Sequence, residues 1–390
     1  MTDKTLGVAV IGGGMAGRAH AAGYRTATTL FGLDRPNIDL VAIADMNEAV
    51  ARDTATRYGY RRAEFSWQAI AEADDIHVVS VVVANHLHRE IVEGLLAAGK
   101  HVLCEKPLAG SLADGEAMVA AAEAASTQTA VGYTYRRTPA VAAIKAQLDA
   151  GSLGDLIHFN GHYWCDYALD PTGPITWRYR GGQGTGALAD VGSHLLDLAE
   201  FVCGPLVEVS GATFATVVTE RPVPAGVTYG HTKSATTGEM APVENEDIAT
   251  FTGTFANGAA GTFSASRVAH RLPDGLGFEL FASAGSAAFD LHRLGEFHIS
   301  TDDLASPVNG PRRVTIGPEH PYIAGGLPMD AGGVGLGVAD LFAYQARAFI
   351  DQIAGTGDPL PPFADGLRGL QIVEAVSESA RNGGAATKVV

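Results

Sequence analysis

The hydrophobic pattern changes character part-way along the chain. Through the first third, short continuous apolar runs such as Val8–Ile11 alternate with segments in which polar residues recur at helical spacing. Short apolar runs separated by helices are typical of parallel strands buried on both faces. From Asp155 onward, long runs of β-forming residues follow one another without intervening helices, which is typical of an antiparallel sheet. The pattern therefore predicts an α/β protein with two domains.

The first domain is predicted to contain a parallel sheet. Its strands are expected at Val8–Ile11, Asp39–Ala44, Arg61–Phe65, Ile76–Val83, Lys100–Cys104 and Thr127–Val131. Helices are expected from Met15, from about Asn47 to Tyr58, and over Ser111–Ala125. This alternation of strands and helices predicts a doubly wound sheet.

The second domain is predicted to follow a break at Gly151-Ser152-Leu153-Gly154. Its strands are expected at Leu156–Trp164, Leu206–Val218, Asp247–Phe255, Gly258–Ser266, Phe278–Ala282 and Ala287–Leu291, with a hairpin turn at Asn257-Gly258. A helix at Pro139–Ala150 is expected to precede this break, and further helices are expected from about Val191, at Val338–Ala354 and at Gly366–Arg381. The Gly- and Pro-rich segment Gly317–Gly337 is expected to be a loop long enough to form a lid or a pocket wall.

Three glycines follow the first strand in the spacing G-x-G-x-x-G. Gly12 permits a tight turn, Gly14 lets a pyrophosphate approach the backbone, and Gly17 lets the next helix pack close to the strand. Met15 and Ala16 begin that helix, whose free N–H groups and positive dipole end favour phosphate. Because the motif stands between a strand and a helix, it predicts a dinucleotide site. The alternative is a glycine-rich turn without a ligand.

Asp45 stands at the end of the second strand. An acidic residue there accepts hydrogen bonds from the adenosine ribose hydroxyls and repels a 2′-phosphate, so it favours NAD over NADP as the cofactor. Asp45 lies further from Gly17 than the usual ~20 residues, and an insertion over Thr26–Asn37 accounts for the excess. A second role, compatible with the first, is to cap the helix that starts near Asn47.

Polar side chains also follow the fourth and fifth strands. Ligands bind at the carboxyl edge of an open α/β sheet, so Asn85, His88 and Glu105 are candidates for cofactor contacts. Pro107 biases Lys106 away from the helical region, and the lysine can donate to a substrate hydroxyl or carbonyl and favour an alkoxide. The alternatives are a histidine that only orients the next helix and a lysine on the surface of a turn.

A second informative stretch contains Asp190 and His194, four residues apart in the helix expected from about Val191. This spacing places both on one helix face. A histidine is suited to remove a hydroxyl proton while hydride leaves the same carbon. A carboxylate one turn away can fix the histidine tautomer or bind a second hydroxyl. The alternative is a capping aspartate and a histidine that only packs in the helix.

The overall composition argues against several classes of binding partner and indicates a cellular compartment. A net charge of −16 argues against nucleic acid and against anionic membrane surfaces. The 3 widely spaced cysteines fit a reducing cytoplasm rather than a disulfide framework or a metal site. No signal peptide is expected, because Met1-Thr2-Asp3-Lys4 leads directly into the first strand. The longest apolar run, Val78–Ala84, is too short to cross a bilayer.

Several motifs together resemble the Gfo/Idh/MocA oxidoreductases, a family that includes sugar and polyol dehydrogenases. The similar segments are Gly12–His20, Ala84–His88, Glu105–Leu108 and the Asp-x-Gly-x-His-x-x-Asp run from Asp190 to Asp197. The resemblance covers nearly the whole chain. It implies a Rossmann domain (1–134), a C-terminal α/β domain with a large open, mostly antiparallel sheet (135–365), and a terminal helix (366–390) that packs back on the Rossmann domain.

The resemblance also implies roles for particular residues. Lys106, Asp190 and His194 match the positions that act together in inositol-dehydrogenase-like members. Trp177 and Arg178 are similar to an element near the nicotinamide, although a buried tryptophan with a surface neighbour is an equal alternative. One face of the second sheet is implied to form a homodimer or homotetramer interface.

The predicted function is NAD-dependent oxidation of a ring hydroxyl of a sugar, anhydrosugar or cyclic polyol, with His194 as the base. The runs Tyr135–Val141 and His320–Tyr322 resemble the levoglucosan-dehydrogenase branch of the family. One alternative is a redox-neutral lyase, hydrolase or epimerase on the same scaffold. Another is a dinucleotide-binding regulator without catalysis, but the presence of Lys106, Asp190 and His194 argues against it.

Overall fold

The computed structural model describes the chain except residues 1–4, 31–34, 183, 227–233 and 302–309. The predicted lead-in Met1–Lys4 and part of the predicted insertion at 26–37 therefore lie outside the described residues. The chain forms two compact units. The first comprises residues up to Arg137 with Tyr322–Ala331 and Leu336–Arg368, and the second comprises Thr138–Pro321, Gly332–Gly335 and Gly369–Val390.

The first unit contains the predicted parallel sheet. Its strands are β1 (Thr5–Ile11), β2 (Asn37–Ala44), β3 (Arg62–Glu64), β4 (Val78–Val81), β5 (His101–Cys104) and β6 (Thr129–Val131). They lie in the order β3-β2-β1-β4-β5-β6, and neighbouring strands pair in parallel. The order reverses between β1 and β4, and such a reversal is where ligands bind in doubly wound sheets.

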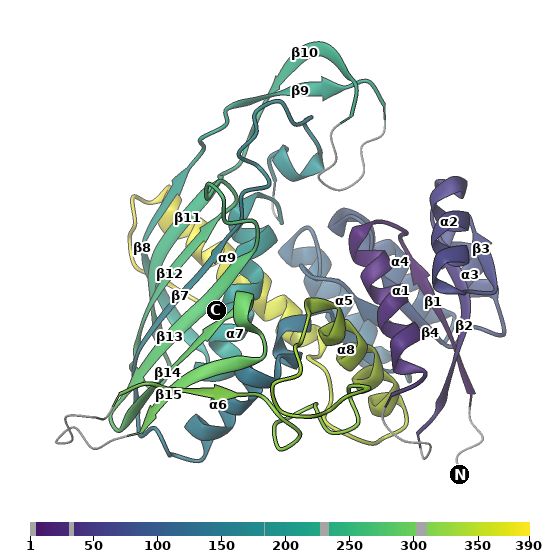
Figure 1. The fold of residues 1–390 in the computed structure, drawn as a ribbon. Coiled ribbons are helices and arrows are strands. Elements are labelled where there is room, and N and C mark those ends of the chain that lie inside the picture. The colour runs from purple at the N-terminus through teal and green to yellow at the C-terminus, as the bar shows by residue number, and fades with distance from the viewer. Residues whose placement is uncertain (1–4, 31–34, 183, 227–233, 302–309) are drawn as a thin grey trace. The chain divides into compact units, whose positions relative to one another are not determined.

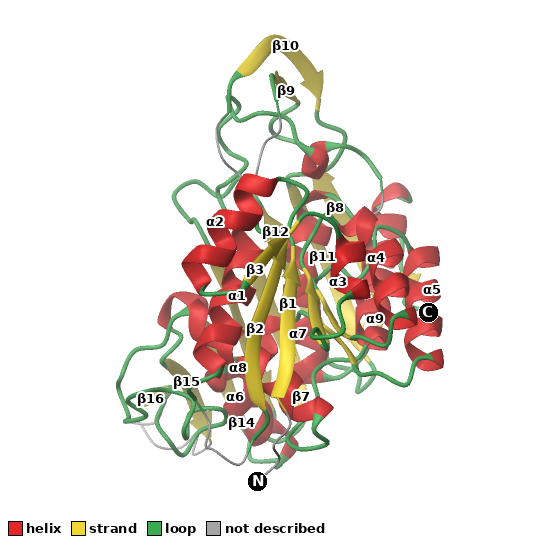
Figure 2. Ribbon diagram, turned by 90° about the vertical axis from the view of Figure 1, so that its right-hand side faces the viewer, coloured by secondary structure: helices red, strands yellow, loops and turns green. Residues whose placement is uncertain are grey.

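Helices cover both faces of this sheet (Figure 2). They are α1 (Met15–Ala27), α2 (Glu48–Tyr58), α3 (Trp67–Glu72), α4 (His88–Ala97), α5 (Leu112–Ala124) and α8 (Val338–Ile353), with short 3₁₀ turns η1 (Asn85–Leu87) and η2 (Thr134–Arg137). Helix α1 contacts α2 and α8, whereas α4 contacts α3 and α5. The core packs apolar side chains of the strands against α1 and α8, among them Val10, Tyr24, Ile43, Leu103 and Phe349.

The second unit is built on a large, mostly antiparallel sheet, as predicted (Figure 1). Its strands are β7 (Leu156–Trp164), β8 (Leu206–Ala215), β11 (Ile248–Phe255), β12 (Ala260–Ser266), β13 (Gly275–Ala282), β14 (Gly285–Asp290), β15 (Glu296–Thr301), β16 (Arg312–Thr315) and β17 (Thr387–Lys388). The order is β16-β15-β14-β13-β7-β12-β11-β8-β17. Strands β7 and β12 pair in parallel, and the other described neighbours pair antiparallel.

Helices pack on one face of this sheet. They are α6 (Pro139–Asp149), which contacts β14 and β15, and α7 (Ser193–Cys203), which contacts β7. A final helix, α9 (Phe363–Arg381), passes from the first unit into the second at Gly369. Phenylalanines of neighbouring strands pack together in the core: the ring of Phe159 lies 5.4 Å from that of Phe278 and 5.7 Å from that of Phe263.

The alternate positions of these strands carry polar side chains that bond to one another. Asn160 donates to Glu279 at 2.9 Å and accepts from Thr262 at 2.6 Å. The indole of Trp164 donates to Ser264 at 2.9 Å. Phe281, 46% exposed, stacks on His158. The alternation predicted from the sequence therefore gives this sheet one apolar face and one polar face.

The structure also corrects the predicted elements. Strands β15, β16 and β17, and a separate pair β9 (Glu220–Pro224) and β10 (Thr236–Pro242), were not expected. Strands β16 and β17 are short, and β9 and β10 contain Pro or Gly, whereas β15 has neither feature and was missed. The helix expected from about Val191 begins earlier, with a π-helical turn η4 (Leu188–Gly192) that continues into α7. Within the described part of the chain, no helix is long and apolar enough to span a membrane.

The second unit contains a fully buried ion pair between Asp247, which directly precedes β11, and Arg267, which directly follows β12. Arg267 Nε lies 2.7 Å from Asp247 Oδ1, and neither side chain is exposed. The other Asp247 oxygen accepts the backbone N–H groups of Val217 and Val218 at 2.7 and 2.9 Å. The Arg267 guanidinium also donates to the side chain of Asn245. The pair is thus compensated by hydrogen bonds on both sides, as a buried pair requires.

We expect Arg267→Leu to lower the free energy of unfolding by about 3–5 kcal/mol, because the Asp247 carboxylate is left buried without its cation. Urea unfolding followed by circular dichroism measures the loss. The matched control is Arg381→Leu, which removes an exposed pair with Glu374 in the same unit and is expected to cost less than about 1 kcal/mol. Equal losses in the two variants would contradict the role of the buried pair.

Candidate active site

The glycine motif forms a tight loop between β1 and α1. Gly12 has φ 103° and donates to the Ala44 carbonyl at 2.7 Å. A Cβ at Gly12 would lie 2.1 Å from the Val82 carbonyl oxygen, and one at Gly17 would lie 1.7 Å from the Gly12 oxygen. Both positions therefore require glycine. A Cβ at Gly14 would meet nothing within 4 Å, so open space lies in front of this backbone.

The N-terminus of α1 faces the same loop. Gly14 is its N-cap, and within the described residues no side chain caps it and no acidic residue stands in its first turn. Met15, the first helical residue, is 70% exposed. Uncapped N–H groups at the positive end of a helix bind phosphate. The residues present therefore fit the pyrophosphate of a dinucleotide.

Asp45 connects the glycine loop to α2. One carboxylate oxygen accepts from Gly13 N–H and the other from Asn47 N–H, both at 2.8 Å. Each oxygen keeps a further lone pair, so Asp45 retains the capacity to accept from ribose hydroxyls. The capping role for α2 belongs to Asn47, whose side chain accepts from Ala49 and Val50.

His88 ties the end of β4 to the turn after β5. It is 1% exposed, and its ring nitrogens lie 3.1 Å from the Leu108 carbonyl oxygen and 3.2 Å from that of Val83. Burial lowers the pKa of His88, against the opposite effect of these carbonyls. The histidine therefore orders backbone at the sheet edge. Asn85, in η1, is 5% exposed at the same edge.

Glu105 and Lys106 follow β5 directly, and Lys106 is half-buried. The Lys106 N–H donates to Glu105 Oε2 at 3.2 Å, while Glu105 Oε1 lies 2.8 Å from His20 Nε2. The peptide bond between Lys106 and Pro107 is cis. The first unit thus gathers the glycine loop, Asp45 and the lysine turn at the carboxyl ends of its strands.

In the second unit, Asp190 lies in the π-helical turn η4 and His194 in the first turn of α7. Such π-helical turns are frequent at functional sites. Glu246 holds the start of this turn, because its Oε1 accepts the Leu188 N–H at 2.9 Å. Burial raises the pKa of Glu246. A Cβ at Gly186 would lie 2.3 Å from the Glu246 carboxylate, which explains the glycine there.

Tyr167 orients the Asp190 side chain. Its hydroxyl donates to Asp190 Oδ2 at 2.5 Å. Burial, and secondly the charge of Asp190, raise the pKa of Tyr167 well above its usual value, so the hydroxyl stays protonated and remains a donor. Arg178 Nε lies 3.9 Å from the same Asp190 oxygen, and the guanidinium stacks on the Trp177 ring. Near His194 lies the ring of Tyr163, at 6.0 Å.

The predicted site residues fall into two groups, one in each unit. Gly12, Gly14, Gly17, Asp45 and Glu105–Lys106 share the sheet edge of the first unit. Asp190, His194, Trp177 and Arg178 belong to the second. Tyr167, Glu246 and His20 were not identified from the sequence as parts of the site. They contact it across large sequence separations, and no local motif indicates such contacts.

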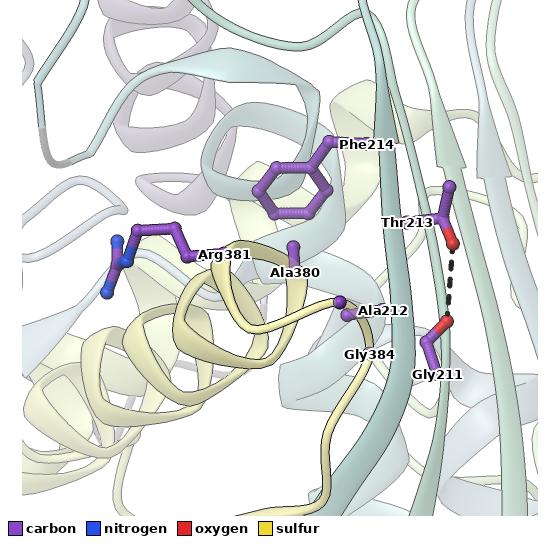
Figure 3. Close-up of a pocket in the computed structure, with 8 residues that line it drawn as sticks. Gly211, Ala212, Thr213, Phe214, Ala380, Arg381 and Gly384 are labelled. Carbon is purple, nitrogen blue, oxygen red and sulfur yellow. Dashed lines mark hydrogen bonds between the residues drawn. The ribbon is translucent and has the colours of Figure 1, made fainter.

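The described part of the second unit also has a hollow of about 540 Å³ between β8 and the end of α9 (Figure 3). Small residues and backbone line it, including Gly211, Ala212, Ala380 and Gly384, with Phe214 at one side. Arg381 is directed away from the others in Figure 3 and pairs with Glu374. The hollow contains none of the predicted catalytic groups.

Comparison with known proteins identifies the family. Residues 6–133 match the oxidoreductase family with an NAD-binding Rossmann fold, and residues 141–288 match the GFO/IDH/MocA C-terminal domain. The chain belongs to the Gfo/Idh/MocA oxidoreductase family. The resemblance predicted from the motifs is confirmed, and the first unit of this Gfo/Idh/MocA oxidoreductase is an NAD-binding domain.

Individual relatives of this Gfo/Idh/MocA protein are sugar and polyol enzymes. Levoglucosan dehydrogenase of Pseudarthrobacter phenanthrenivorans is 35% identical over 97% of this chain and 96% of that protein. Inositol 2-dehydrogenase of Acidothermus cellulolyticus is 31% identical over 52% of this chain and 54% of its own length. The structure of levoglucosan dehydrogenase with NADH and levoglucosan has a TM-score of 0.89 and 33% identity, covering 99% of this chain and 100% of that one.

We expect Asp45→Ser to tighten NADPH binding relative to NADH by about tenfold or more, because a like charge facing the 2′-phosphate costs several kcal/mol. Fluorescence titration with both nucleotides measures the ratio. Asp53→Ser is the matched control, since it removes an equal charge from an exposed position on α2. Wild-type protein that binds NADPH as tightly as NADH would contradict the role of Asp45.

Proposed function

We propose that this protein oxidises a ring hydroxyl of a sugar, anhydrosugar or cyclic polyol with NAD as the hydride acceptor. The observation that carries the proposal is the lysine turn of the NAD-binding unit, together with an Asp–His pair whose aspartate is held by Tyr167. The full-length similarity to levoglucosan dehydrogenase supports the substrate class.

The cofactor is assigned to the glycine loop and its surroundings. Backbone N–H groups of Met15 and Ala16 would bind the pyrophosphate, Gly14 would leave it room, and Asp45 would accept from the ribose. Asn85, Glu105, Trp177 and Arg178 complete the proposed set, and His88 contributes by ordering the backbone at the sheet edge. When bound, NAD supplies an electrophilic carbon that takes up the hydride from the substrate.

We assign a separate role to each of the three proposed catalytic residues. His194 removes the proton of the reacting hydroxyl as general base. Asp190, kept oriented by Tyr167, directs that base or binds a neighbouring hydroxyl. Lys106 donates to the reacting oxygen and stabilises negative charge on it. A substrate with several hydroxyls suits such a site, because polar groups left without a partner strongly disfavour analogues that lack them.

We also propose a cytoplasmic homodimer or homotetramer. The polar face of the second sheet, with exposed Phe281 and a ladder of hydrogen-bonded side chains, supports the interface. The cysteines Cys104, Cys165 and Cys203 are buried, and so sparse and widely spaced a set supports a reducing compartment. The acidic net charge of −16 supports the absence of nucleic-acid and membrane partners.

The experiment that tests the function is an NADH absorbance assay of purified protein with NAD and a panel of inositols, aldoses, anhydrosugars and glycosides. Sustained NADH production with one sugar class is expected. In that assay Lys106→Ala should lower kcat/KM by about 10²-fold or more. A protein that binds NADH yet reduces no NAD with any sugar would overturn the proposal in favour of a redox-neutral enzyme or a regulator.

We expect Tyr167→Phe to lower kcat/KM by about tenfold or more, because a hydrogen bond to a charged group contributes about 1.5–3 kcal/mol. Steady-state kinetics with the best sugar measures the loss. The control is Tyr163→Phe, which removes a hydroxyl that donates to Asp274, and which is expected to affect kcat less. If Tyr167→Phe leaves kcat/KM unchanged, Tyr167 does not orient the aspartate in catalysis.

A further inference from the structure

A chain of buried hydrogen bonds in the first unit leads to the residue that precedes Lys106. Tyr24 Oη lies 3.1 Å from Ser80 Oγ. Ser80 Oγ lies 3.2 Å from His20 Nδ1, and His20 Nε2 lies 2.8 Å from Glu105 Oε1. Tyr24 and Ser80 are fully buried and His20 is 2% exposed. The chain therefore runs through the protein interior from α1 across β4 to the end of β5.

The proton positions along this chain follow from its acidic end. A carboxylate can only accept, so His20 Nε2 donates to Glu105. In a neutral imidazole, Nδ1 then accepts from Ser80 O–H, which leaves Ser80 Oγ to accept from Tyr24. Burial raises the pKa of Tyr24 despite its bond to Ser80, so this phenol keeps its proton. With the His20 ring neutral, every donor in this series of bonds points toward Glu105, and such aligned bonds strengthen one another.

The far side of Glu105 bonds to the backbone of Lys106. Glu105 Oε2 accepts the Lys106 N–H at 3.2 Å. Room for the carboxylate exists because residue 132 is glycine: a Cβ there would lie 2.5 Å from Glu105 Oε1. The His20 ring is held in turn by Phe342 of α8, whose ring lies edge-on at 5.2 Å. Glu105 is thus clamped between His20 and the lysine that follows it.

A hydrolytic role for this cluster is excluded by its burial. Ser, His and Glu in hydrogen-bond contact are the components of a nucleophilic triad. Ser80, however, is 0% exposed and lies within β4, so no substrate carbonyl can reach its hydroxyl. This series of hydrogen bonds therefore orders the protein groups beside it rather than acting on a substrate.

We propose that His20 and Glu105 are positioning residues for Lys106. The buried chain fixes the Glu105 carboxylate, and that carboxylate fixes the backbone from which the lysine side chain extends. This inference rests on the catalytic role proposed above for Lys106. Its physical basis is that a displacement of a catalytic group by about 1 Å can cost about 10²-fold in rate.

The test uses the full-length protein with His20→Leu and His20→Gln. His20→Leu removes the donor to Glu105, whereas the glutamine amide can replace Nε2–H. We expect His20→Leu to lower kcat about tenfold or more, with KM for the sugar and Kd for NADH changed by less than about threefold. His20→Gln is expected to restore most of kcat. This split and rescue would not result from a general loss of stability.

The protein offers a matched control among its buried tyrosines. Tyr24 and Tyr60 lie in the same core, but within the described residues the Tyr60 hydroxyl has no hydrogen-bond partner. Tyr24→Phe is expected to lower kcat by about threefold or more, whereas Tyr60→Phe leaves it unchanged. Equal effects of the two substitutions, or a kcat of His20→Leu within about twofold of wild type, would overturn the proposal.

A readout without substrate separates this inference from the proposed function. Acetic anhydride acylates lysine amines, and peptide mass spectrometry measures the rate at Lys106 relative to the exposed Lys388. We expect His20→Leu to change the relative rate at Lys106, and His20→Gln to restore it. Identical labelling in wild type and His20→Leu would overturn the positioning role, even in a protein that oxidises no sugar. If wild type fails the sugar assay but the labelling differs, only the proposed function is lost.

Discussion

The close approach of helix α1 to the parallel sheet is the constraint on which the first unit depends. A Cβ at Gly17 would lie 1.7 Å from the Gly12 carbonyl oxygen, and a Cβ at Gly23 would lie 2.7 Å from the Phe342 carbonyl oxygen of α8. The helix is therefore fixed at both of these contacts by the absence of a side chain. Because it lies so close, its N-terminus meets the glycine loop at the end of β1, and its next turns bring His20 and Tyr24 against Ser80 of β4.

In the second unit, two consecutive acidic residues order the segments that carry Asp190 and Arg178. Glu246 accepts the Leu188 N–H at the start of the turn that contains Asp190. Asp247 neutralises Arg267, whose guanidinium donates to the Arg178 carbonyl at 3.1 Å. One short segment before β11 thereby orders both the aspartate and the arginine beside it. The stability of this buried charge cluster and the geometry of the site are consequently set by the same bonds.

The sequence was sufficient for features that a local pattern encodes. Continuous apolar runs identified the parallel strands, and the glycine spacing identified the tight turn of an NAD-binding domain, because each reflects contacts made within a few residues. The bonds of Glu246 and Tyr167 to η4 and of His20 to Glu105 join residues 58, 23 and 85 positions apart. No periodicity reports such pairings. The earlier start of the helix at Leu188 depends on Glu246, so it too was beyond local reasoning.

The carboxylate of Asp45 also holds two segments of the backbone in place. It bonds Gly13 of the phosphate loop with one oxygen and Asn47 at the start of α2 with the other. The nucleotide preference proposed for Asp45 and the shape of the loop therefore depend on a single side chain. Exchange of this acid for a residue that admits a different nucleotide leaves two backbone N–H groups without their acceptor. We therefore expect a single exchange to shift the nucleotide preference at the expense of an ordered loop, and further substitutions at the loop and at α2 to recover that order.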